Sequence, residues 1–188
     1  CIVKIEETVK PQATSPDGIK LVIASPQNAG EGLAALISAA AAQTGANPLT
    51  ANNISAANDW LLDTFGNRNT VIPATPATDF ATKGVSAGDA GLLSMASWRR
   101  ARLDTRSDFT LAPAEPNVAL DFPFAISNSS APQAQQAARA FREFLLAPAQ
   151  QSALTGHFLE PAGTVPSDLD IEGGAVQRLL DWTQRGLR

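Results

Sequence analysis

One segment constrains the fold of this chain more than any other: a short apolar strand pattern, a turn, and then a helix pattern. Residues 20–24 read Lys-Leu-Val-Ile-Ala, a Ser-Pro turn and a small-residue loop follow, and an Ala/Leu-rich helix is expected over residues 31–43. This order places a helix N-terminus beside the carboxyl end of a strand. Open α/β sheets bind ligands at such places, because the N–H groups of a first helical turn have no partner within the helix.

The loop after this strand therefore supplies the first candidate ligand-binding residues, which are Ser25, Pro26, Gln27, Asn28 and Gly30. The loop is not a dinucleotide fingerprint, because Ala35 stands where a third glycine would be needed, and the chain has no Gly-Lys-Ser/Thr phosphate loop. A tight strand-to-helix connection without any ligand is the alternative interpretation.

The remainder of the chain mixes strand and helix patterns at a spacing that predicts an α/β fold. Strands are expected at residues 2–9, 20–24, 90–97, 109–112 and 117–126. Besides the helix that Gly45 ends, helices are expected before Gly66, after Thr75, and at residues 131–146, 148–154 and 175–185. We expect an N-terminal strand and linker over residues 1–18 and one α/β domain over residues 19–188.

Composition argues against several classes of partner. The net charge is −4 with a pI near 4.9, and the one dense arginine cluster, at residues 99–106, is interrupted by an aspartate. This balance disfavours nucleic acid and anionic membrane surfaces as partners. No apolar run approaches the roughly 20 residues that span a bilayer.

Catalytic chemistry is nearly absent from the sequence. The one histidine, His157, follows Gly156 at an expected helix end, and the alternating acidic residues at 168, 170 and 172 lack the spacing of a calcium loop. Glu115 and Asp121 are a candidate acid/base pair, but nothing in the sequence fixes their distance. We expect a protein that is not an enzyme and that carries no metal and no cofactor.

The three tryptophans divide into two expected roles. Helical spacing places Trp60 and Trp182 in the core or at its edge, whereas Trp98 follows the apolar run at residues 90–97 directly. We therefore expect Ser97 and Trp98 to line a ligand-binding cleft, together with Thr75 and the loop after residue 24.

Four stretches resemble a known family. They are Ser-Pro-Gln-Asn at 25–28 with Gly-Leu-Ala-Ala-Leu at 32–36, residues 91–97, residues 138–151 with the phrase Phe-Arg-Glu-Phe-Leu-Leu-Ala-Pro-Ala-Gln-Gln, and residues 176–182. Together they resemble the bacterial extracellular solute-binding proteins of the type 2 periplasmic fold. More narrowly, they resemble the module that precedes a von Willebrand factor A-type domain in actinobacterial surface proteins.

The resemblance implies an open mixed sheet flanked by helices, like one lobe of a type 2 periplasmic-binding protein. It further implies a receptor outside the cytoplasmic membrane that binds a small solute or peptide without converting it. Two departures from the family stand out: the chain is shorter than a full module, so one lobe is expected to be largely missing, and Ala29, Gly30 and Glu31 replace the Ser/Thr donors at the helix start. An anionic ligand is not expected at a helix end that Glu31 neutralises.

Two functions remain open. The first is solute binding, with transport as the associated role and with attachment to the outer face of the cytoplasmic membrane through a lipid on Cys1; a chance position of Cys1 is the alternative. The second is a protein-interaction module of the cell envelope, in which a degenerate solute-binding fold contacts a membrane complex, a neighbouring domain or a second copy of itself, because a missing lobe exposes apolar surface.

Overall fold

The structure is a computed structural model that describes residues 2–4, 18–66, 69–112, 114–120, 123–163 and 168–186. Its contacts divide the chain into two compact units, one formed by Cys1–Val118 with Ser167–Arg188 and one by Ala119–Pro166. The expected boundary between residues 18 and 19 stays a prediction. The N-terminal strand, however, belongs to the same sheet as the strand at residues 21–23.

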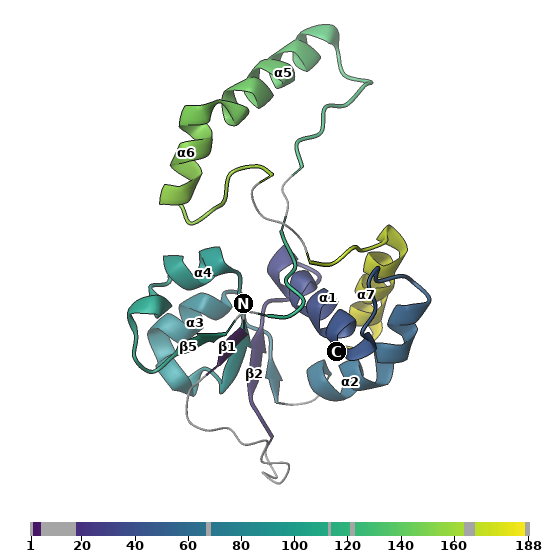
Figure 1. Ribbon diagram of the computed structural model, residues 1–188, viewed down its shortest axis with the longest axis vertical. Helices are drawn as coiled ribbons and strands as arrows, with labels where there is room; N and C mark the ends of the chain where they lie inside the picture. Colours follow the sequence, from purple (N-terminus) through teal and green to yellow (C-terminus); the bar gives the residue numbers. More distant parts are fainter. Residues whose placement is uncertain are drawn as a thin grey trace. The chain divides into compact units, whose positions relative to one another are not determined.

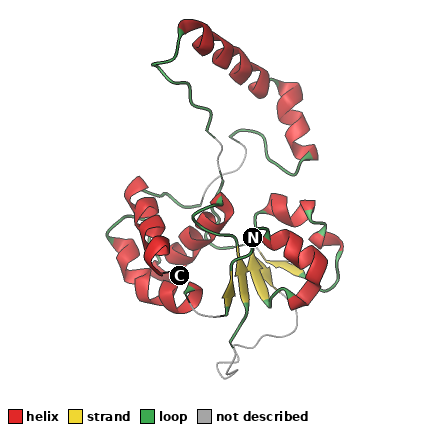
Figure 2. Ribbon diagram, turned by 180° about the vertical axis from the view of Figure 1, so that it is seen from behind, coloured by secondary structure: helices red, strands yellow, loops and turns green. Residues whose placement is uncertain are grey.

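The first unit is built on a five-stranded mixed sheet with the order β3-β2-β4-β1-β5 (Figure 2). The strands are β1 (Ile2–Lys4), β2 (Leu21–Ile23), β3 (Thr70–Val71), β4 (Ala90–Leu92) and β5 (Thr110–Ala112). β2 pairs in parallel with both β3 and β4, and β1 runs antiparallel to β4 and β5. The α/β fold with an open mixed sheet and flanking helices is thus confirmed.

One face of the sheet carries a core made with α1 (Gly30–Thr44), the 3-10 turn η1 (Asn53–Ala57), α2 (Asn58–Phe65) and α7 (Gly173–Gly186) (Figure 1). Ile23 of β2 packs there against the fully buried Leu36 and Leu61. α1 ends at Gly45, whose φ of 64° is the left-handed C-cap that the sequence predicts.

The opposite face carries a second core made with α3 (Pro76–Lys83), η2 (Gly84–Ser86), α4 (Met95–Arg100) and η3 (Leu103–Thr105). Val22 points to this face because neighbouring residues of a strand alternate between faces. Phe109 anchors the cluster with edge-on ring contacts to Phe80, at 5.5 Å between centroids, and to Trp98, at 6.4 Å.

The second unit contains α5 (Pro132–Leu146) and α6 (Pro148–Gly156), and none of its described residues is buried. Phe141 contacts the rings of both Phe124 and Phe144, yet Phe141 and Phe144 remain 52% and 53% exposed. This unit therefore has an apolar helix face without a core of its own.

Two expectations about secondary structure are wrong. The apolar run at residues 90–97 is not one long strand, because β4 ends at Leu92 and α4 begins at Met95. Within residues 117–126 the described positions form no strand, which agrees with the missing N–H of Pro123. Trp60 is 38% exposed but contacts the core residue Phe65 edge-on, at 6.4 Å between ring centroids, so it lies at the edge of the first core as expected. Most of the expected strand at residues 2–9 lies outside the described residues.

Candidate functional site

The candidate site lies at the edge of the sheet where β2, β3 and β4 end. These three strands are parallel, so the segments that follow them leave from the same edge. β2 leads to α1 on the side of the first core, whereas β4 leads to α4 on the side of the second core. The point between β2 and β4 is thus a topological switch point, the place where open α/β sheets bind ligands.

The loop at residues 25–30 is held by a turn on Ser25. The carbonyl oxygen of Ser25 accepts hydrogen bonds from the N–H of Asn28 at 3.1 Å and the N–H of Ala29 at 2.9 Å. Ala29 caps α1 with extended backbone and no side-chain hydrogen bond. The N–H groups of Gly30 and Glu31 have no partner within the helix, because both belong to the first turn of α1.

Gly32 allows α1 to approach the sheet closely. A Cβ atom at this position would lie 2.2 Å from the carbonyl oxygen of Ala24 and 2.9 Å from the nitrogen of Pro26. Both are backbone atoms, which no side-chain rotation can move away. Glycine at residue 32 therefore fixes how the first turn of α1 sits beside the end of β2.

Glu31 spans the switch point. Its carboxylate accepts a hydrogen bond from the backbone N–H of Ser94 through Oε1, and one from the hydroxyl of Ser97 through Oε2 at 3.3 Å. Ser94 caps α4, because its Oγ accepts from the N–H of Ser97 at 3.1 Å. The two loops are thus joined by a side chain of the protein, and two donors of the β4–α4 turn are already satisfied.

The predicted site residues occupy different environments along this edge. Ser25 and Ser97 are half-buried, Pro26 is buried, and Gln27, Asn28 and Gly30 are exposed. Thr75 is the exposed N-cap of α3, and its side chain makes no cap hydrogen bond. The structure joins the first loop to Ser97 through Glu31, and no described contact joins Thr75 to them.

Trp98 does not present a stacking surface. It is 3% exposed and packs in the second core against Phe109. The correction has a simple cause: α4 begins at Met95, so residue 98 falls on the helix face that turns toward the core. A ligand at the sheet edge would meet Ser94 and Ser97 before this ring.

Ser94 is a further candidate site residue, which the sequence pattern alone did not indicate. In Ser94-Met95-Ala96-Ser97, a serine stands three residues before the N–H group that its side chain accepts from, which is the spacing of a helix N-cap. The apolar residues around Ser94 favoured a continuous strand and so concealed this pattern. The role of Glu31 at a helix end was anticipated, but its reach to the β4–α4 turn was not.

The other candidate groups lie elsewhere. His157 follows α6 in the second unit and is exposed, and Asp121 is outside the described residues. The acidic segment near residue 170 is held by Asn47, whose side chain donates to the carbonyl oxygen of Asp168 and accepts from the N–H of Asp170. In the described part of the chain, no group of three or more His, Cys, Asp or Glu side chains could hold a metal ion. No helix described here combines the length and apolarity needed to cross a bilayer.

Comparison with known proteins agrees with this topology. No curated protein and no solved structure matches the chain significantly. Residues 3–160, however, match the family described as bacterial extracellular solute-binding protein. The matched segment includes residues of both units of the structure. The chain therefore belongs to the bacterial extracellular solute-binding proteins.

Proposed function

We propose that the chain is an extracytoplasmic domain that binds a small molecule or peptide at the switch point between β2 and β4, without converting it. One observation carries the proposal: the first turn of α1 and the β4–α4 turn meet there, with Glu31 reaching Ser94 and Ser97. Family membership supports the same function.

The position of Glu31 indicates the class of ligand. Its carboxylate already satisfies the N–H of Ser94 and the hydroxyl of Ser97, which are donors that a bound oxyanion would need. It also adds negative charge beside the N-terminus of α1. We therefore expect an uncharged or cationic solute that donates an amine or hydroxyl hydrogen to Glu31 and accepts from the first turn of α1.

A thermal-shift screen tests this function. The panel contains amines, amino acids, sugars, short peptides and oxyanions, and a ligand at one hundred times its Kd stabilises the folded state by about 2.7 kcal/mol. An uncharged or cationic compound should raise the Tm, and Glu31→Gln should reduce that rise. Glu172→Gln is the matched control, since Glu172 is exposed in the same unit. A panel without any stabilising compound, or with oxyanions alone, contradicts the proposal.

A second candidate function is a protein-interaction module of the cell envelope. The apolar face of α5 favours it, because Phe141, Phe144 and Leu145 are all exposed in a unit whose described residues include none that is buried. Light scattering should then show a dimer or larger species that Phe141→Ser disrupts and that the exposed control Arg139→Ser, on the same helix, does not. A monomeric protein that cross-links to no partner would contradict a role as a protein-interaction module.

Two finer features belong to the same proposal. Cys1 lies outside the described residues, and its attachment to a lipid is tested by the intact mass of the protein isolated from bacterial membranes. The position before a von Willebrand factor A-type domain rests on the stretch at residues 176–182, which lies within α7. An intact mass without a lipid would contradict the lipid attachment of Cys1. A gene that encodes no von Willebrand factor A-type domain after this segment would contradict the proposed position.

A further inference from the structure

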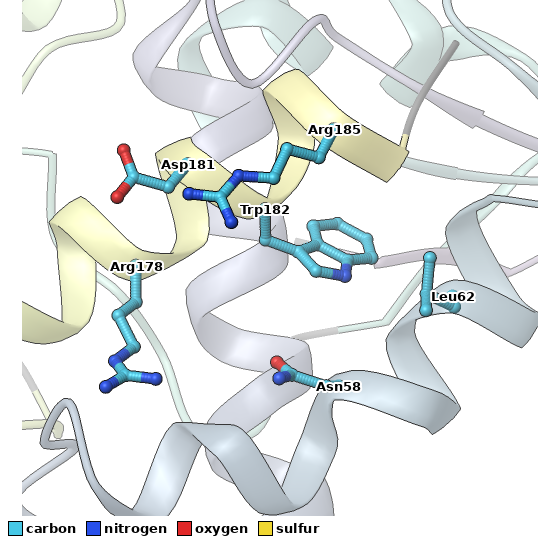
Figure 3. A pocket seen from close by; sticks show the side chains of 6 residues that line it. All are labelled: Asn58, Leu62, Arg178, Asp181, Trp182 and Arg185. Atoms are coloured by element: carbon cyan, nitrogen blue, oxygen red, sulfur yellow. The ribbon is translucent and has the colours of Figure 1, made fainter.

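A second concave site lies away from the sheet edge, between α2 and α7. It has a volume of about 520 Å³, within the usual size range of small-molecule pockets. Its lining consists of Asn58, Leu62, Arg178, Asp181, Trp182 and Arg185 (Figure 3). All six residues belong to the first unit, and none of them takes part in the proposed solute site.

The indole of Trp182 is the first sign that this cavity takes a ligand. Its Nε1 atom is buried and has no hydrogen-bond partner among the described residues. Buried polar atoms in native proteins nearly always have a partner, so an unpaired one calls for an acceptor that the protein does not itself supply. In Figure 3 this nitrogen lies on the side of the ring that faces Asn58 and Leu62 of α2.

Two arginines provide the second sign. Arg178, Trp182 and Arg185 follow a spacing of four and then three residues, which places them along one stripe of α7. Among the described residues, neither guanidinium lies within ion-pair distance of a carboxylate. Arg178 donates one hydrogen bond to the hydroxyl of Ser55 at 3.2 Å, and Asp181 instead accepts from Gln177 at 2.8 Å.

These groups define one ligand chemistry. A guanidinium binds a carboxylate through paired N–H donors, and the carboxylate also accepts from an indole N–H. The indole ring and the half-exposed side chain of Leu62 offer apolar surface to the body of the ligand. We propose that the cavity between α2 and α7 binds a small monocarboxylate with a planar apolar body, independently of the solute at the sheet edge.

The indole N–H signals of the protein report directly on this site. Trp60, Trp98 and Trp182 give three such signals in a nitrogen–proton correlation spectrum, and Trp182→Phe assigns the one of interest. Titration with phenylacetate should move the Trp182 signal in a saturable way and leave the Trp98 signal, which comes from a buried ring, in place. Phenylacetamide, which has the same ring without the charge, should move it little.

Variants of the arginines complete the test. Arg185→Gln or Arg178→Gln should weaken phenylacetate binding by about tenfold or more, because each removes a charge-assisted contact. Arg100→Gln, an exposed arginine outside the cavity, should leave it unchanged. Binding of the amide as tight as that of the acid, a uniform shift of all three indoles, or no shift at millimolar phenylacetate would overturn the proposal. If Trp182→Phe unfolds the protein, the arginine variants still identify the Trp182 indole signal, because it is the signal that no longer moves on titration with phenylacetate.

Discussion

Removing the Glu31 carboxylate tests the link between the two loops of the candidate site. The carboxylate accepts from the N–H of Ser94 and the hydroxyl of Ser97 in a partly buried position. Hydrogen bonds to charged groups contribute about 1.5–3 kcal/mol each when well shielded, and half-burial favours the lower end. We expect Glu31→Ala to lower the free energy of unfolding by about 2 kcal/mol, because the N–H of Ser94 loses its acceptor and water replaces it only in part.

Differential scanning calorimetry measures this change. For a chain of this length, a loss of about 2 kcal/mol corresponds to a fall in Tm of about 4–8 °C. Glu31→Gln retains an acceptor oxygen for Ser94, so it should cost about half as much. The exposed Glu172→Gln serves as the control for loss of a carboxylate in the same unit.

A double-mutant cycle separates the contact from unrelated effects. Ser97→Ala removes the hydroxyl that donates to Glu31 Oε2, so Glu31→Ala and Ser97→Ala should be coupled by about 0.5–1 kcal/mol. Additive effects of the two substitutions, or a Tm of Glu31→Ala equal to that of the wild type, would refute the bridge across the switch point.

Three further predictions concern the framework of the first unit. Gly32→Ala should lower the free energy of unfolding by about 3 kcal/mol in a urea unfolding experiment, because the new Cβ would meet the backbone of Ala24; a stability within error of the wild type would contradict this close approach. Leu36→Ala, at a fully buried position of α1, should lower the free energy of unfolding by about 2–5 kcal/mol, and a loss below 1 kcal/mol would show that the first core is loosely packed. Arg106 holds the pKa of Asp108 below its ordinary value, first through their hydrogen bond, so this pair stabilises the fold near neutral pH and stops doing so as the pH falls through the lowered pKa. The Tm difference between wild type and Asp108→Asn should therefore shrink in acid, and a difference that stays constant down to pH 2 would exclude the linkage.

Local sequence signals predicted the elements whose structure is decided locally. The end of α1 at Gly45 follows from the left-handed conformation that glycine accepts, and Pro76 begins α3 because proline fits the first turn of a helix. The strand at residues 21–23 and its loop were predictable because an apolar run with two β-branched residues is followed, after Ala24, by Ser-Pro. The family resemblance then added the mixed sheet that the pattern alone left undefined.

Elements whose structure depends on tertiary packing were predicted less well. The run at residues 90–97 is largely apolar because it serves two environments in turn, a strand between β2 and β1 and then a helix against the second core. Apolarity alone does not show where one ends and the other begins. The role of Trp98 was predicted wrongly for the same reason, because the start of α4 at Met95 buries this ring. Leu61 and Phe65 occupy the inner face of α2 and leave Trp60 at the edge of the core, as its spacing predicts.

The packing of α1 determines the chemistry of the candidate site. The strands are only two or three residues long, so the sheet itself offers few hydrogen bonds with which to position the loops. Gly32 lets α1 lie directly against Ala24 at the end of β2, and this contact sets the height of the first helical turn above the sheet edge. At that height the side chain of Glu31, one residue earlier, reaches the N-cap of α4. A helix start that elsewhere would attract an anion therefore carries its own carboxylate, held by Ser94 and Ser97, and this is the reason that we propose a donor-rich, uncharged or cationic solute for this edge.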